Sequence, residues 1–107
     1  MAINVFRNIT HNIDLAGAEV YTAPAGFSGI VLMAQVTNVT ATPATVSMSV
    51  LTGSAETFLA YEFAVPGNDS AGLLSGKLVL QSGQRIFISG SDDGSLQLVM
   101  SILESQN

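Results

Sequence analysis

The sequence predicts a single all-β domain, an antiparallel β-sandwich of about seven to nine short strands with an immunoglobulin-like or jelly-roll-like arrangement. Three observations favour this fold class. Apolar and polar residues alternate along much of the chain, turn residues recur between the alternating segments, and no window repeats its apolar residues at helical spacing. The 107 residues are the size of one domain. Strands that follow one another without crossover helices are expected to pair antiparallel.

Residues 3–9 and 19–22 are expected to form two short strands, because β-branched and aromatic residues are common in them. A Pro-Ala-Gly turn at 24–26 separates them from a longer strand at 28–40, in which the even-numbered residues form an apolar face. After a turn that contains proline, the strand at 45–51 alternates valine or methionine with serine or threonine. These segments therefore read as strands with one side toward a core.

The second half of the chain continues the same pattern. Strands are expected at 57–65, 77–80, 85–89 and 95–104, the last with four apolar residues in strict alternation. Proline, glycine, asparagine, aspartate or serine mark the turns between them, at residues 66–69, 82–83 and 92–94. We expect residues 15–107 to form the sandwich domain and residues 1–14 to form an N-terminal segment, either an extended arm or an edge strand.

The core is expected on the more consistently apolar face of each strand, since one face of each sheet meets the other sheet in a sandwich. The expected core residues are Ile30, Leu32, Val36, Val46, Met48, Val50, Leu78, Leu80, Ile86, Ile88, Leu96, Leu98, Met100 and Ile102.

Several strands carry apolar residues on their second face as well. These second apolar faces are expected to be shielded from water, either by a neighbouring chain or by a loop of this chain that folds back over them. We therefore expect a homo-oligomer. The candidate interface residues are Val31, Met33, Val39, Phe87, Val99 and Leu103.

The charge balance disfavours two classes of partner. Charged residues make up 10% of the chain, and three basic residues against eight acidic ones give a formal net charge of −5. A nucleic-acid binder needs clustered Lys and Arg side chains, so no nucleic-acid partner is expected. The net charge also disfavours an anionic membrane surface, and the apolar runs are too short for a membrane helix, so no membrane partner is expected.

No catalytic residue, cofactor or metal site is expected. The chain has no cysteine, and its one histidine, His11, lies near Asp14 but belongs to no nucleophile motif. Asp92 and Asp93 offer oxygen atoms to a calcium ion, but a hairpin turn explains an Asp-Gly pair better. The expectation is a protein that is not an enzyme.

Four segments share their turn-and-strand patterns with one known group of proteins. Residues 20–26 resemble an opening Tyr-Thr-x-Pro-Ala-Gly, and residues 36–47 resemble a strand that ends in Asn, a Thr/Ala-rich turn and another strand. Residues 78–86 are similar to Leu-x-Leu-x-x-Gly-Asp-x-Ile, with Gln84 in place of the acidic residue, and residues 94–104 resemble a closing strand that ends in Leu-Glu. These patterns resemble the small β-sandwich virion proteins of tailed bacteriophages.

The resemblance implies a structural protein of the virion, made in the cytoplasm of a host bacterium. A capsid decoration or cement protein that binds the major capsid protein and stabilises the capsid lattice is the first expectation, and a tail, baseplate or fibre component is the alternative. A homotrimer would suit the local threefold positions of a capsid. An alternative of another class is a carbohydrate-binding module on the virion surface that uses exposed aromatic residues. Phe58, Tyr61 and Phe63 lie close together in the sequence, although Tyr61 and Phe63 share one face and are expected in the core.

Overall fold

The computed structural model describes residues 3–107, and in that range it consists of nine strands and no helix. All strand pairs are antiparallel, and the strands form two packed sheets, which confirms the predicted sandwich. No segment of residues 3–107 is a helix that could cross a membrane. Met1 and Ala2 of the expected N-terminal segment lie outside the described residues. The strands are β1 (Asn4–Ile13), β2 (Ala18–Thr22), β3 (Phe27–Asn38), β4 (Ala44–Thr52), β5 (Ala55–Val65), β6 (Ser70–Gly72), β7 (Leu78–Leu80), β8 (Arg85–Gly90) and β9 (Leu96–Gln106).

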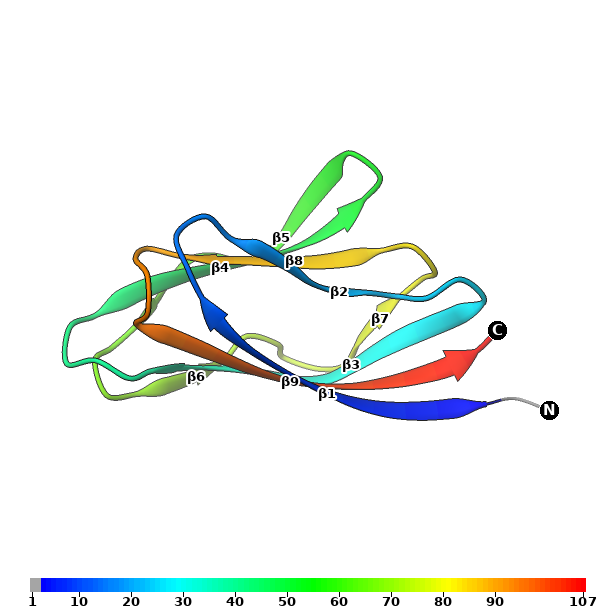
Figure 1. The fold of residues 1–107 in the computed structure, drawn as a ribbon, viewed down its shortest axis with the longest axis horizontal. Coiled ribbons are helices and arrows are strands. Elements are labelled where there is room, and N and C mark those ends of the chain that lie inside the picture. Colours follow the sequence, from blue (N-terminus) through cyan, green and yellow to red (C-terminus); the bar gives the residue numbers. More distant parts are fainter. Residues whose placement is uncertain (1–2) are drawn as a thin grey trace.

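The two sheets stack as two layers (Figure 1). Sheet A has the order β1-β9-β3-β6, with β7 paired to another part of β3, and sheet B has the order β2-β8-β4-β5. The first and last strands pair over the whole length of β1, from Asn4 opposite Ser105 to Ile13 opposite Leu96. The start of β1 and the end of β9 therefore lie at the same end of a molecule that measures 49 × 27 × 21 Å (Figure 1).

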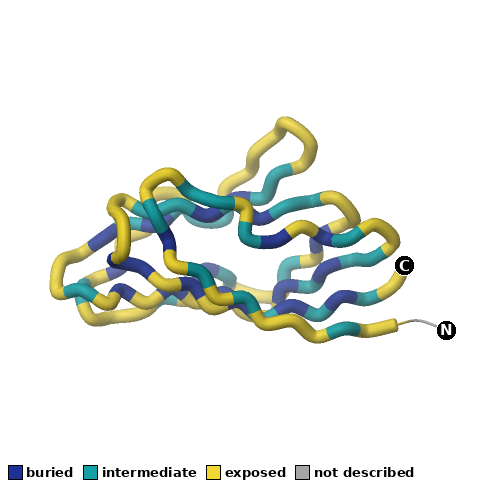
Figure 2. Tube along the Cα trace, in the orientation of Figure 1, coloured by how far each residue is buried: buried dark blue, intermediate teal, exposed yellow. Residues whose placement is uncertain are grey.

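The core fills the space between the two layers, where the buried residues of both sheets face one another (Figure 2). Strands β4, β8 and β9 turn the predicted faces inward, as their alternation requires. Val50 and Leu78 are partly buried and pack against this core, which also includes Ile13, Ala34 and Leu73. The predicted core residues that are buried are Val36, Val46, Met48, Leu80, Ile86, Ile88, Leu96, Leu98, Met100 and Ile102.

The prediction was wrong for the first half of β3, because a β-bulge interrupts that strand. The register of β3 with β9 shifts between Val31 and Met33, so Leu32 is an extra residue in the ladder. Because of the extra residue, the odd-numbered side chains point to the core before the bulge and the even-numbered side chains point to it after the bulge. Val31, predicted at an interface, is fully buried in the core of its own chain, and Leu32, predicted in the core, is 36% exposed. Ile30, also predicted in the core, is only partly buried and faces away from it.

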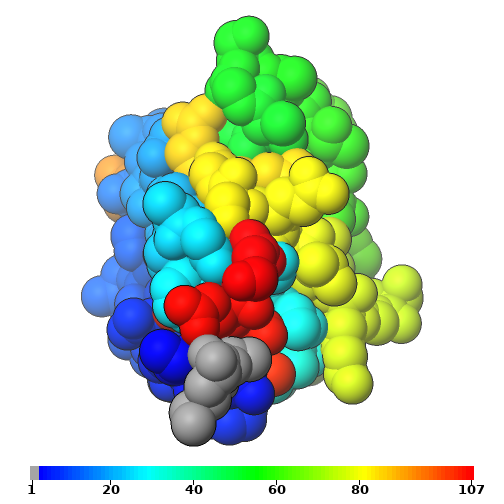
Figure 3. Space-filling model, turned by 90° about the vertical axis from the view of Figure 1, so that its right-hand side faces the viewer, coloured from blue at the N-terminus to red at the C-terminus, as the bar shows by residue number. Residues whose placement is uncertain are grey.

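Strands β4 and β5 extend beyond sheet B as a hairpin whose tip stands away from the sandwich (Figures 1 and 3). Gly53 at the tip has φ +60°, a conformation that glycine adopts without strain. The turn between β7 and β8 and the first residue of β8 anchor this hairpin. Gln84 Nε2 donates a hydrogen bond to Thr52 Oγ1 at 2.9 Å, and Arg85 Nη2 donates to the Gly53 carbonyl oxygen.

Candidate functional site

The side of sheet A that faces away from the core is the most distinctive surface of the chain, and we call it the outer face. The strand residues that point to it contain no Asp, Glu, Lys or Arg, although the chain as a whole carries eleven such residues, three basic and eight acidic. The strands thus form an uncharged surface in an acidic protein, and Lys77, which precedes β7, lines a hollow on the same face. The outer face consists of the even-numbered residues of β1, the odd-numbered residues of β9, and Ser28, Ile30, Leu32, Met33, Gln35, Thr37, Ser70, Gly72 and Val79 of the neighbouring strands.

An apolar row crosses the outer face from one edge of sheet A to the other. Phe6 of β1 pairs with Leu103 of β9, Leu103 pairs with Ile30 of β3, and Ile30 pairs with Val79 of β7. Side chains opposite each other on neighbouring strands lie about 4.5–5.5 Å apart at Cβ, so these four form one continuous row. Phe6 is 75% exposed and Val79 is 58% exposed. An exposed apolar row of this kind is typical of an interaction surface.

A shallow hollow lies beside the bulge of β3 on the same face. Its volume is about 270 Å³, below the range of about 300–1,000 Å³ that is usual for small-molecule pockets. The hollow suits a side chain of a partner protein better than a cofactor. It is lined by Leu32, Met33, Ala34, Gln35, Gly72, Leu74, Gly76 and Lys77.

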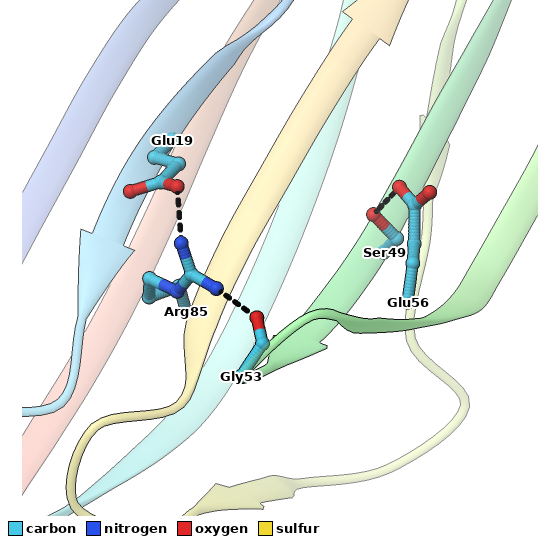
Figure 4. Close-up of polar contacts among 5 residues, drawn as sticks. All are labelled: Glu19, Ser49, Gly53, Glu56 and Arg85. Atoms are coloured by element: carbon cyan, nitrogen blue, oxygen red, sulfur yellow. Dashed lines mark hydrogen bonds and ion pairs between the residues drawn. The ribbon is translucent and has the colours of Figure 1, made fainter.

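The opposite surface, formed by sheet B, is charged. Arg85 Nη1 pairs with Glu19 Oε1 at 2.6 Å, and Ser49 Oγ donates a hydrogen bond to Glu56 Oε2 at 2.6 Å (Figure 4). The same arginine also reaches the carbonyl oxygen of Gly53. The two sides of the sandwich therefore differ in chemistry, and the strands of sheet A offer a partner an outer surface with few charges to desolvate.

Half of the predicted interface residues come together on the outer face. Met33, Val99 and Leu103 all point to it, and Met33 and Val99 are 38% and 37% exposed. Val39 lies just beyond the end of β3 and is 49% exposed. Three of the six candidate interface residues thus lie on the outer face, and Val39 is exposed beyond the end of β3.

The other two members lie elsewhere. Val31 is in the core, as described above, and Phe87 points outward from sheet B. The ring of Phe87 is covered by the turn before β2, because a Cβ atom at Gly17 would lie only 2.4 Å from Phe87 Cζ. A loop of this chain therefore covers Phe87. The sequence left open whether a neighbouring chain or such a loop would cover the second apolar face.

The sequence interpretation missed Phe6, Ile30 and Val79. In the expected first strand, Phe6 has the same parity as Asn4 and Asn8, and a large apolar residue on an otherwise polar face is a signal that could have identified it. The register that joins these residues into one row links strands distant in sequence, so it could not be predicted from the alternation of single strands.

Three aromatic residues of β5 form a second exposed group. Tyr61 is 66% exposed, and Phe58 and Phe63 are each 45% exposed, so the expectation that Tyr61 and Phe63 face the core was wrong. The reason is that β5 is an edge strand whose register with β4 shifts twice. The rings of Phe58 and Tyr61 pack edge to face with centroids 4.8 Å apart.

A charged cluster links the edges of the two sheets beneath the outer face. Glu104 of β9 is 2% exposed and accepts hydrogen bonds from Tyr21 Oη at 2.7 Å and Arg7 Nε at 2.8 Å. Burial alone would raise the pKa of Glu104, but the hydrogen bonds from Tyr21 and Arg7 outweigh it and hold that pKa below its ordinary value of 4.5. Burial and the hydrogen bond to Glu104 raise the pKa of the Tyr21 hydroxyl well above its ordinary value of 10.0.

This cluster predicts a loss of stability at both ends of the pH range. The folded-state pKa of Glu104 is lowered. The ionised Glu104 side chain therefore contributes to the free energy of unfolding above pH 4.5, and this contribution is lost as the pH falls through the folded-state pKa. The folded-state pKa of Tyr21 is raised. The protonated Tyr21 hydroxyl therefore contributes to the free energy of unfolding below pH 10.0, and this contribution is lost as the pH rises toward the folded-state pKa. Urea unfolding at a series of pH values should show both losses.

Tyr21→Phe removes one hydrogen bond to a charged group and should lower the free energy of unfolding at neutral pH by about 1.5–3 kcal/mol. The alkaline loss should shrink in this variant. Tyr61→Phe is the matched control, because Tyr61 is exposed, and it should leave both the stability and its pH profile unchanged. Equal profiles for the two variants would contradict the role of the cluster.

The residues weighed for catalysis do not come together. His11 lies on the inner side of β1 opposite Leu98, and its Nε2 atom is buried without a hydrogen-bond partner among the described residues. Asp14 instead accepts a hydrogen bond from the Gly17 amide, and Asp93 accepts one from the Leu15 amide. Within residues 3–107, no three His, Asp or Glu side chains are placed to hold a metal ion.

Comparison with known proteins shows a shared fold and no close relative. No protein-family model matches the sequence, and no curated protein matches it. Among solved structures, the chain is similar to a subunit of Bacillus endospore appendages, a family of disulfide-linked pili, with 15% identity, a TM-score of 0.58, and coverage of 98% of this chain and 88% of the other. At this identity the likeness concerns the fold alone.

Two further structures share the fold. A chain in the acidic stable capsid of the Helicobacter pylori bacteriophage KHP30 has 14% identity, a TM-score of 0.55, and coverage of 98% of this chain and 93% of its own. The nucleoplasmin-like N-terminal domain of Drosophila FKBP39 has 15% identity, a TM-score of 0.51, and coverage of 92% and 88%. The sandwich thus extends over nearly the whole of each chain.

Proposed function

We propose that this protein is a structural component of a bacteriophage virion, and that it acts as a decoration (cement) protein on the capsid lattice. The observation that carries the proposal is the uncharged outer face of sheet A with its apolar row of Phe6, Leu103, Ile30 and Val79. The phage-like segments of the sequence and the fold shared with a chain of a phage capsid support it.

The outer face approaches the size of a standard interface. The strands of sheet A have 10, 11, 12, 3 and 3 residues, and at about 3.3 Å per residue and about 4.8 Å per strand the face measures roughly 600 Å². A standard interface covers about 800 Å² of each partner. Repetition over a lattice would multiply modest contacts into strong overall binding. In this proposal the partner is the major capsid protein, and the homotrimer at local threefold positions is an arrangement that only the resemblance implies.

Met33→Glu should weaken capsid binding at least about tenfold. The side chain lies on the outer face at the hollow, where a partner would have to desolvate the new carboxylate. Because Met33 is 38% exposed and outside the core, the variant should fold normally. The measurement is the occupancy of purified particles lacking this protein, titrated with wild-type or variant protein.

Thr22→Glu is the matched control, because Thr22 is an exposed strand residue on the outer side of sheet B. It should decorate particles like the wild type. Normal decoration by the Met33→Glu protein would overturn the assigned face. Electron microscopy of particles with and without the protein then distinguishes a position on the head from one in the tail, baseplate or fibre.

A carbohydrate-binding module is the second candidate, and the exposed ring of Tyr61 is the observation that favours it. Sugars stack on exposed aromatic faces, and Phe58 holds the Tyr61 ring from one side. Binding to a glycan array that disappears in Tyr61→Ala, with decoration of particles unchanged, would favour this candidate over the first.

A further inference from the structure

Within residues 3–107, β1 is the edge strand that lacks the usual protection of a sheet edge. Proteins protect such edges with very short strands, bulges, charged side chains or proline. Strand β2 has five residues and a register shift, β6 and β7 have three residues each, and β5 has register shifts and two glutamates. Strand β1 has ten residues in unbroken register with β9, and Arg7 is its single charged residue.

The backbone groups of the even-numbered residues of β1 point to this free edge. The Gln106 amide donates a hydrogen bond to the Ile3 carbonyl oxygen at 3.0 Å, so Ile3 and Gln106 form a hydrogen-bonded pair next to the β1–β9 ladder. Such pairs alternate along antiparallel strands, so the odd-numbered residues of β1 bond to β9 and the even-numbered ones face away. Those five residues, Asn4, Phe6, Asn8, Thr10 and Asn12, are all exposed.

We propose that β1 pairs antiparallel with β1 of a second copy of this chain, which joins the two sheets A into one continuous sheet. The two-fold axis passes at Asn8, so that Asn8 faces Asn8 of the second copy and Phe6 faces Thr10 of the second copy. All five even-numbered residues then form hydrogen-bonded pairs, with about ten backbone hydrogen bonds in total.

The neighbouring registers are less favourable. A shift by one residue would turn the outer faces of the two sheets to opposite sides. The register centred on Ile9 loses one of the hydrogen-bonded pairs and places Arg7 opposite His11 of the second copy. The register centred on Arg7 places two arginines opposite each other, and like charges in directly opposite positions are destabilising.

A second copy is the occupant that the charges favour. Two chains of net charge −5 repel each other wherever their acidic side chains meet, but β1 contains no acidic residue. The nearest carboxylate in the ladder, Glu104, is buried and paired with Arg7. The pairing would also place two uncharged outer faces side by side. It does not depend on the proposed virion role, and it implies a dimer in place of the trimer expected from the resemblance.

Cross-linking through single cysteines tests both the contact and its register. The chain has no cysteine, so Asn8→Cys introduces one thiol per copy. At the two-fold axis the two Cα atoms would be about 5.5 Å apart, which a disulfide can span. In Thr10→Cys the two thiols would be separated by about four residues along the strands, roughly 13 Å, which is too far. We therefore expect covalent dimers from Asn8→Cys and not from Thr10→Cys.

Light scattering of the isolated chain provides the second measurement. The wild type should have the mass of a dimer, and Asn8→Lys, which places two ammonium groups at the axis, should have that of a monomer. Gln97→Lys is the matched control, because Gln97 is exposed on the same face but lies on β9, which is paired on both sides. It should remain dimeric.

A monomeric wild type at millimolar concentration would overturn the proposal, and so would an Asn8→Lys protein that associates like the wild type. Equal cross-linking of the two cysteine variants would overturn the register. These outcomes concern the isolated chain, so they are distinct from a failure to decorate particles.

Discussion

Val31→Asp is expected to prevent folding, whereas Leu32→Asp, one residue later, should yield a folded protein. Val31 has no exposed surface, so aspartate at this position would bury an unpaired carboxylate. The cost is several kcal/mol, which is comparable with the total stability of about 5–15 kcal/mol of a typical domain. Leu32 is 36% exposed at the bulge, so its aspartate would remain hydrated.

Circular dichroism and the dispersion of amide signals in nuclear magnetic resonance spectra distinguish the two variants. The pair provides its own control, because both variants exchange an aliphatic residue for the same acid in the same strand. A folded Val31→Asp protein together with an unfolded Leu32→Asp protein would show that β3 has no bulge between Val31 and Met33.

Leu98→Ala should lower the free energy of unfolding by about 2–5 kcal/mol, because truncation of a buried leucine removes apolar contacts and leaves a cavity. Leu98 is 1% exposed at the centre of sheet A, between His11 of β1 and Val36 of β3. For a domain of this size each kcal/mol corresponds to about 4–8 °C in Tm, so a thermal melt detects the change.

Val99→Ala is the control for that experiment, because Val99 follows directly in β9 but points to the outer face and is 37% exposed. It should change the stability by less than about 1 kcal/mol. A loss under about 0.5 kcal/mol for Leu98→Ala would mean that β9 turns its other face to the core.

The sequence was sufficient to predict the elements that depend on local patterns. Strand β9 shows why: Leu96, Leu98, Met100 and Ile102 alternate with other residues, and all four are buried. Alternation determines which residues share a face of a regular strand, and turn residues determine where the strand ends. The same reasoning identified the antiparallel sandwich and separated an inner from an outer face in β4 and β8.

The candidate site was only partly predictable from the sequence. Met33, Val99 and Leu103 were placed on an outer face correctly, but Phe6, Ile30 and Val79 were not recognised as their neighbours. Phe87 was placed outside the core correctly, but its cover is the turn at Gly17, and the approach of that turn to sheet B depends on the tertiary structure.

By itself, the sequence determined the fold class, every strand except the three-residue β6, and the scarcity of charge, because each follows from residue type and local spacing. Only the tertiary structure decided which side of β3 is buried, since a bulge in the ladder with β9 exchanges Val31 and Leu32. It also decided that residues 4–13 lie at the open edge of sheet A and that the apolar row crosses four strands. Pairing between strands distant in the chain depends on how two sheets fit around one core, and local alternation carries no information about that fit.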